Sequence, residues 1–167
     1  MFMLRIIPLL ALWVLPACAD PTPTCASGQP VAVFDFPSEL ITAQHFEVNG
    51  QESLETVTFS APAMQVELRQ SGCETVVQDY TFTVPKANAY FTGQPAESAG
   101  MFFYFLGGLS RSLAHYQAFG DAVNARAAVL TPGRETELVP GMQIKVDRLS
   151  TGDELIYRIV LRQVALK

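Results

Sequence analysis

The stretch AMQVELRQSGCETVVQDYTFTV, residues 63–84, decides the fold of this chain. Apolar residues alternate with polar ones in both of its halves: Met64, Val66 and Leu68 in the first, and Tyr80, Phe82 and Val84 in the second. A period of two is typical of a half-buried β-strand. Residues 70–72, Gln-Ser-Gly, supply turn chemistry between the halves. We therefore predict a β-hairpin over residues 63–84.

The same alternation continues on both sides of this hairpin. It predicts further strands at residues 31–36, 44–48 and 56–59, and a second hairpin between residues 142 and 166. Within the second of these strands, Phe46 and Val48 share one face, while His45 and Glu47 share the other. The Asn-Gly pair at residues 49–50 predicts a tight turn directly after it. Residues 155–166 are apolar on both faces, which suits a central strand.

A helical pattern separates the two strand-rich regions. Apolar residues follow one another at spacings of three and four: Phe102, Leu106, Leu109, Leu113 and Tyr116. This stripe predicts one amphipathic helix, with Ser98 as the candidate N-cap. Gly107 and Gly108 fall inside it, which indicates either a close approach to the sheet or a kink. Residues 122–130 are a candidate second short helix.

These elements predict a single globular α+β domain over residues 31–167. Its N-terminal half is rich in strands, one main amphipathic helix follows, and a β-hairpin ends the chain. An order of strands, helix and strands favours an antiparallel β-sheet with the helix packed on one face.

The first twenty residues have the features of an export signal. Arg5 precedes an apolar run over residues 6–15, and small residues follow at Ala17 and Ala19. The run is too short for a membrane-spanning helix, which needs about 20 residues. We expect residues 1–17 to be a signal peptide, with cleavage after Ala19 as the alternative.

The tetrapeptide Leu15-Pro16-Ala17-Cys18 resembles the lipobox of bacterial lipoproteins. This resemblance covers the leader alone. It implies that Cys18 is the first mature residue and carries lipid on its sulfur, and that residues 18–30 form a tether. Ala19, not an acid, follows the cysteine, which in such lipoproteins favours the outer membrane. The expected location is therefore the cell envelope or periplasm, with a lipid anchor in the outer membrane.

Both cleavage sites remove Cys18 from the count of thiols and leave Cys25 and Cys73. An oxidising compartment favours a disulfide between them. It would close a loop of roughly 50 residues and add about 4 kcal/mol to stability on the chain-entropy argument. The alternative is two separate free thiols.

The formal charge of −5 argues against a nucleic-acid partner, because phosphate contacts need clustered Lys and Arg. Acids are concentrated in the N-terminal half, where residues 20–79 contain only one base, Arg69. Two interpretations follow: an acidic face for a cationic partner, or two halves that neutralise each other on packing. On the first, the candidate partner-binding residues are Glu47, Glu67, Glu74 and Asp79.

Motifs for chemistry are missing from the sequence. His45, Glu47 and Asp35 offer a conceivable but unsupported metal site, and neither lone cysteine has a ligand partner at metal-binding spacing. The chain has no G-x-S-x-G elbow and no phosphate-binding loop. We therefore predict no metal, no cofactor and no catalytic residue.

Three functions remain open at this point. The first is a non-enzymatic binding role toward another envelope component, for example inhibition of a basic cell-wall hydrolase. The second is a periplasmic carrier of an apolar ligand, with the aromatic residues 102–105 and the sheet as its walls. The third is an enzyme of unrecognised type with a cleft around His45 or His115.

Overall fold

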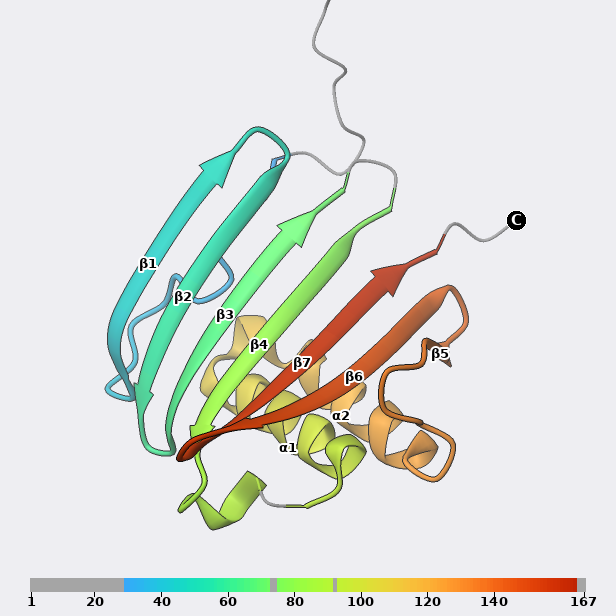
Figure 1. Cartoon of the computed structure of the whole chain (residues 1–167). Helices are drawn as coiled ribbons and strands as arrows, with labels where there is room; N and C mark the ends of the chain where they lie inside the picture. Colours follow the sequence, from blue (N-terminus) through green and yellow to red (C-terminus); the bar gives the residue numbers. More distant parts are fainter. Residues whose placement is uncertain (1–28, 73–74, 92, 165–167) are drawn as a thin grey trace, which may run out of the picture.

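Seven strands form one antiparallel sheet in the order β1-β2-β3-β4-β7-β6-β5 (Figure 1). The computed structural model describes residues 29–72, 75–91 and 93–164. The strands are β1 (Ile41–Asn49), β2 (Glu52–Ser60), β3 (Ala63–Ser71), β4 (Val77–Pro85), β5 (Thr136–Val139), β6 (Met142–Thr151) and β7 (Glu154–Gln163). The predicted hairpin of residues 63–84 is confirmed as β3 and β4, and the predicted C-terminal hairpin as β6 and β7.

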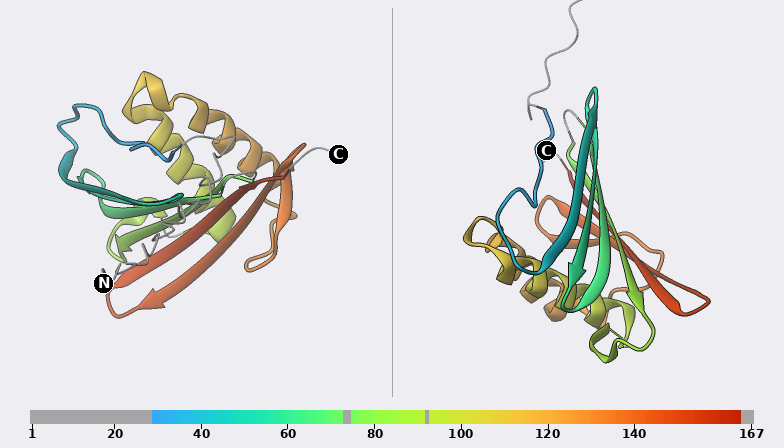
Figure 2. Two further views of the ribbon diagram at one scale, coloured as in Figure 1. Left: turned by 90° about the horizontal axis from the view of Figure 1, so that it is seen from above. Right: turned by 90° about the vertical axis from the view of Figure 1, so that its left-hand side faces the viewer.

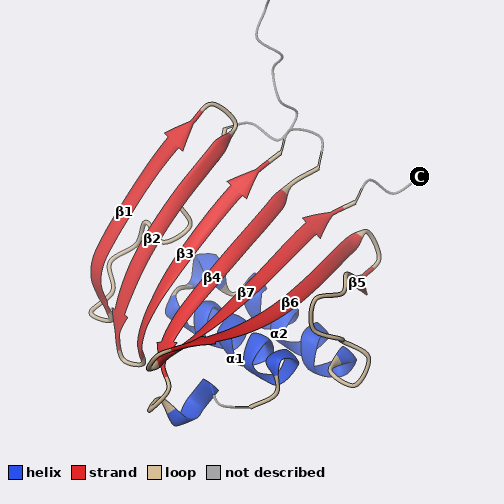
Figure 3. Ribbon diagram, viewed as in Figure 1, coloured by secondary structure: helices blue, strands red, loops and turns tan. Residues whose placement is uncertain are grey.

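Four helical elements lie between β4 and β5 in the chain: η1 (Ala89–Phe91), α1 (Pro95–Leu109), η2 (Arg111–Leu113) and α2 (His115–Arg126). They pack on one face of the sheet and leave the other face without helices (Figures 2 and 3). The predicted α+β class, an antiparallel sheet with helix on one face, is therefore confirmed.

Aromatic rings fill the space between α1 and the sheet. Phe102 stacks on Phe82 of β4 at 4.1 Å between ring centroids and on Phe91 of η1 at 4.2 Å. Tyr157 of β7 meets the same ring edge-on at 5.2 Å. Each of these four side chains is almost wholly buried. Phe102 therefore joins α1, η1 and two strands that are far apart in the sequence.

The expected single helix through Tyr116 is wrong in its second half. The helix α1 ends at Leu109, and Ser110 is extended, with φ −156° and ψ 154°. Leu113 then lies in η2 and Tyr116 in α2. The apolar spacing survives the break because both helices bury residues against the same sheet. Hydrophobic periodicity indicates which residues face the core. The same residues face the core whether the segment forms one helix or two.

The start of α1 also differs from the expected N-cap. The helix begins at Pro95, and the backbone N–H of Gln94 donates to the Glu97 carboxylate at 3.1 Å. Ser98 is fully buried in the first turn, where its hydroxyl donates to the Phe91 carbonyl at 3.4 Å. A proline at the first helical position costs no hydrogen bond, because that N–H has no partner within a helix.

Of the adjacent glycines Gly107 and Gly108 of α1, the first serves the contact with α2 and neither serves a contact with the sheet. A Cβ atom at Gly107 would lie 2.6 Å from Cγ of Gln117 and 2.8 Å from its backbone nitrogen. A Cβ atom at Gly108 would meet nothing within 4 Å. Close approach of α1 to α2 therefore involves Gly107 and not Gly108, and a Cβ atom at Gly100 would likewise lie too close to Oδ1 of Asn124 in α2. The second helix begins at His115, ahead of the expected residues 122–130.

Residues 31–36 do not form the predicted strand. They run in irregular conformation on the helix side of the sheet, as the blue segment in Figure 2 shows. Phe34 is nevertheless fully buried and packs edge-on against Phe59 at 6.1 Å. The alternating pattern therefore identified a core residue correctly, but its backbone bonds to a side chain instead of a neighbouring strand.

Candidate functional site

The open face of the sheet is the surface without helices, and it carries alternate residues of the long strands. On β2, Leu54, Thr56 and Thr58 lie on it, whereas Val57 and Phe59 are buried against the helix side. As predicted, His45 and Glu47 of β1 belong to the open face. The register of the strands places residues of distant segments side by side there, which the sequence does not reveal.

One cross-strand row of this face contains two of the predicted partner-binding acids. Glu47 of β1 lies opposite Leu54 of β2, Leu54 lies opposite Arg69 of β3, and Arg69 lies opposite Asp79 of β4. Cross-strand neighbours on one face are about 5 Å apart, so the four side chains form a continuous line. The row has an acid at each end and a base and an apolar residue between them.

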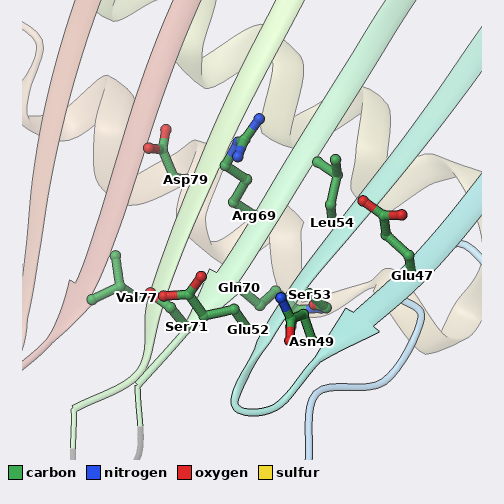
Figure 4. Close-up of a pocket in the computed structure, with 10 residues that line it drawn as sticks. All are labelled: Glu47, Asn49, Glu52, Ser53, Leu54, Arg69, Gln70, Ser71, Val77 and Asp79. Carbon is green, nitrogen blue, oxygen red and sulfur yellow. The ribbon is translucent and has the colours of Figure 1, made fainter.

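A shallow depression of about 330 Å³ surrounds this row (Figure 4). Its lining residues come from the ends of four strands: Glu47, Asn49, Glu52, Ser53, Leu54, Arg69, Gln70, Ser71, Val77 and Asp79. Figure 4 shows the side chains of Arg69 and Leu54 between the carboxylates of Glu47 and Asp79. The lining combines polar and charged side chains with the apolar side chains of Leu54 and Val77.

Ion pairs use two of the predicted acids. Arg69 binds Glu67 through Nε and Nη2 at 3.0 and 2.9 Å. Arg158 of β7 binds both carboxylate oxygens of Asp79 through Nε at 3.0 and 3.1 Å. These hydrogen bonds raise the pKa of the Arg158 guanidinium. The pair between Asp79 and Arg158 joins the acidic half of the chain to the basic half, as the neutralising interpretation predicts.

The remaining acids of the depression are less constrained. The side chain of Glu47 is 61% exposed, and its Oε2 lies 3.7 Å from Nε2 of His45 on the same strand. Glu52 is also exposed, at the start of β2. Glu74 and the two disulfide candidates, Cys25 and Cys73, lie outside the described residues. Of the four predicted acids, the structure therefore places Glu47 and Asp79 in one site and Glu67 beside it.

The conceivable metal site does not come together. His45 and Glu47 lie on the open face, whereas Asp35 belongs to the segment on the helix side. Among the residues with described positions, no three His, Cys, Asp or Glu side chains gather closely enough to hold a metal ion. His115 is exposed on α2 and rests against the Tyr116 ring, with 4.3 Å between ring centroids.

A second, apolar hollow of about 400 Å³ opens beside α1. Its walls come from the turn after β2, from η1 and from α1: Ala61, Pro62, Tyr90, Phe91, Met101 and Phe105. Of the aromatic run that the carrier function would place around a pocket, Phe102 and Phe103 are wholly buried in the core. Phe105 alone of residues 102–105 lines this hollow, and Tyr90, which is 70% exposed, stands at it.

Sequence reasoning missed the most unusual polar residue of the molecule, Glu55. It is completely buried on the helix side of β2, next to Val57 along the same face. Its carboxylate accepts the backbone N–H groups of Val33 at 2.7 Å and Phe34 at 3.1 Å, and the side-chain amide of Gln44 at 2.9 Å. The period of two in β2, extended back by one step from Val57, would have revealed its burial.

Neither α1 nor α2 combines the length with the apolar character that a membrane-crossing helix needs, and the same holds for every helix in the described part of the chain. Comparison with known proteins gives no relative: no protein-family model matches this chain, and no curated protein or solved structure shows significant similarity to it.

Proposed function

We propose that this chain is an exported, lipid-anchored protein of the cell envelope that binds a cationic partner with the open face of its sheet. The role is a binding role and not a catalytic one. The basic cell-wall hydrolases, of which lysozyme is an example, are the class of partner that fits this charge, and binding would inhibit them.

The depression around Leu54 is the observation that carries this proposal. Glu47 and Glu52 are exposed acids in its lining, whereas Arg69 is held by Glu67. Opposite charges attract over about 10 Å at moderate ionic strength, so exposed acids around the depression favour approach of a basic surface. The half-buried side chain of Leu54 in the same depression provides apolar surface that a partner can cover.

The cellular location in this proposal is inferred from the leader sequence. Lipidation at Cys18 would leave residues 19–28 as the link between the membrane and the first described residue, Gln29. Mass spectrometry of the purified protein tests this, because a diacylglycerol on Cys18 adds a defined mass that the Cys18→Ala variant cannot carry. An N-terminus at Asp20 without lipid would contradict the anchor and support the alternative cleavage.

Lysozyme serves as the probe for the binding role. Titration by calorimetry should show a complex that weakens as salt increases, since exposed charges are screened. The variant Glu52→Lys should weaken the complex by about tenfold. The matched control Glu137→Lys, with the same charge change on β5 at the other edge, should bind as the unaltered protein does. Absence of both binding and inhibition at about 100 µM protein would overturn the hydrolase version.

A second function, carriage of an apolar ligand, is favoured by one observation, the hollow between η1 and α1. Its volume of about 400 Å³ is within the range of small-molecule sites, and its walls are apolar and aromatic. The fluorescent fatty-acid analogue cis-parinaric acid tests it. Binding that Met101→Lys abolishes, and that Leu149→Lys on β6, at an exposed residue outside the hollow, leaves unchanged, would support this function; no fluorescence increase at micromolar protein would exclude it.

A further inference from the structure

The strand β1 is an edge strand with little protection against pairing. It pairs with β2 on one side, and no strand of the described chain pairs with its other side. It is nine residues long, and seven of those residues are exposed. Edge strands of natural proteins are usually blunted by proline, lysine or short length, because their free backbone groups can pair with another chain. The sequence ITAQHFEVN contains neither proline nor lysine. Its pairing with β2 is shifted only at its start, between Ile41 and Ala43, and is regular from Ala43 to Asn49.

The opposite edge of the sheet has the protection that β1 lacks. The strand β5 has four residues, its pairing with β6 is shifted between Glu137 and Val139, and Pro140 follows directly. A short, irregular edge that ends in proline offers few groups in register to a partner strand. Only one edge of the described sheet is therefore open to addition of a strand.

We propose that β1 pairs antiparallel with β1 of a second copy of this chain, with the twofold axis at Phe46. The two sheets would then join into one continuous sheet across the dimer. Backbone hydrogen bonds between the two edges supply the attraction, as in other cases of strand addition. Contacts between side chains select the register. With Phe46 opposite Phe46, the sequence of β1 is complementary to itself.

Charge favours the proposed register. With Phe46 opposite Phe46, His45 of each copy lies opposite Glu47 of the partner subunit, and this pair occurs twice. Both side chains already project together on the open face, where they are 3.7 Å apart within one chain. Opposite charges or hydrogen-bonding pairs across two strands stabilise pairing, whereas like charges oppose it. A register one step away, centred on His45, would set the two histidines against each other.

Apolar contact favours the same register. Phe46 lies on the helix side of β1 and is only half-buried, and Val48 beyond it is 44% exposed. The proposed pairing sets the two phenylalanine rings against each other at the centre of the interface. Aromatic cross-strand pairs are among the stabilising ones. The register centred on His45 would place each ring opposite Gln44 instead.

Charge variants of β1 test the proposal through self-association. The mature protein is studied by sedimentation equilibrium in density-matched detergent, because the proposed lipid on Cys18 requires one. We expect the unaltered protein to dimerise at micromolar concentration. His45→Glu should weaken the dimer by about tenfold or more, because acids then face acids at both contacts. The double variant His45→Lys/Glu47→Lys should weaken it equally, because bases then face bases.

Mixing and charge reversal make the test specific. An equimolar mixture of His45→Glu with His45→Lys/Glu47→Lys should restore dimers, because each acid then meets a base. The reversed variant His45→Glu/Glu47→Lys should dimerise on its own in the proposed register, but would be repelled in the register centred on His45. Glu137→Lys, on the opposite edge, is the matched control and should behave as the unaltered protein does.

Three results would overturn the proposal. One is a monomer at about 100 µM unaltered protein. Another is dimerisation that the β1 variants affect no more than Glu137→Lys does, which would place the interface elsewhere. A third is recovery in the mixture without recovery in the reversed variant, which would keep β1 as the interface but refute the register centred on Phe46.

Discussion

The carboxylate of Glu55 accepts the backbone N–H of Phe34 at 3.1 Å, across 21 positions of sequence. The acid is completely buried and also accepts the N–H of Val33. Two backbone groups that would otherwise need a neighbouring strand are thus satisfied by one side chain. This contact attaches the N-terminal segment to the sheet.

Replacement of Glu55 should therefore release that segment. Glu55→Ala leaves the N–H groups of Val33 and Phe34 without their acceptor, which should lower the free energy of unfolding by roughly 2–4 kcal/mol. Hydrogen exchange at both amides should accelerate more than exchange in the strands. The exposed neighbour Glu52→Ala is the control and should change stability by less than about 0.5 kcal/mol. Unchanged exchange at Phe34 in Glu55→Ala would refute the attachment.

Gly107 and Gly108 of α1 should respond in opposite directions to alanine. Gly107→Ala places a Cβ atom 2.8 Å from the Gln117 backbone nitrogen, so the helices must separate, at a cost of about 1–3 kcal/mol. Gly108→Ala meets nothing within 4 Å and should stabilise the helix by about 0.5–1 kcal/mol. Urea unfolding of both variants measures this difference, and equal effects would contradict the packing of α1 on α2.

Stability should fall in alkaline solution because of two buried phenols. Tyr80 and Tyr116 share a hydrogen bond of 2.5 Å between their oxygens, and burial raises the pKa of both. The folded chain therefore holds these protons more tightly than the unfolded chain. Their contribution is fully present below about pH 10, the ordinary value for tyrosine, and is lost above it by up to about 1.4 kcal/mol per pH unit for each phenol.

Urea unfolding at pH 9 and pH 11 measures this loss. The double variant Tyr80→Phe/Tyr116→Phe should be less stable at pH 9, because it lacks the hydrogen bond, but should lose less between the two pH values. Tyr90→Phe, which alters a phenol that is 70% exposed, should keep the full alkaline loss. An identical loss in the double variant would show that other groups cause the alkaline sensitivity.

The bidentate pair between Arg158 and Asp79 should contribute little to stability despite its geometry. The Arg158 side chain is 58% exposed, although Asp79 is only 17% exposed, and pairs with a partner open to water typically contribute less than about 1 kcal/mol. Arg158→Gln should therefore lower the free energy of unfolding by less than about 1 kcal/mol. The difference should shrink further in 1 M salt, where the Debye length is about 3 Å. A loss of several kcal/mol would mean that the pair is shielded from water.

Local patterns in the sequence were sufficient for the secondary structure wherever neighbouring residues determine it. The alternation in residues 63–84 and the Asn-Gly turn after β1 identified strands, faces and turns correctly. These patterns gave the wrong secondary structure where a side chain distant in the sequence accepts the backbone hydrogen bonds that a neighbouring strand would otherwise accept. Residues 31–36 alternate as a strand does, but Glu55 takes their backbone N–H groups. The break after Leu109 was hidden because both helices face the same core.

By itself, the sequence determined the α+β class, the strand faces and the expectation of an exported chain with one lipidated and two paired cysteines. Only the tertiary structure decided that β4 lies beside β7, that Glu47 and Asp79 share one depression, and that β1 forms an open edge. The physical reason is the distance along the chain between the residues that interact. Strand faces follow from a period of two within one segment, whereas strand order and register follow from packing between segments that are far apart in the chain.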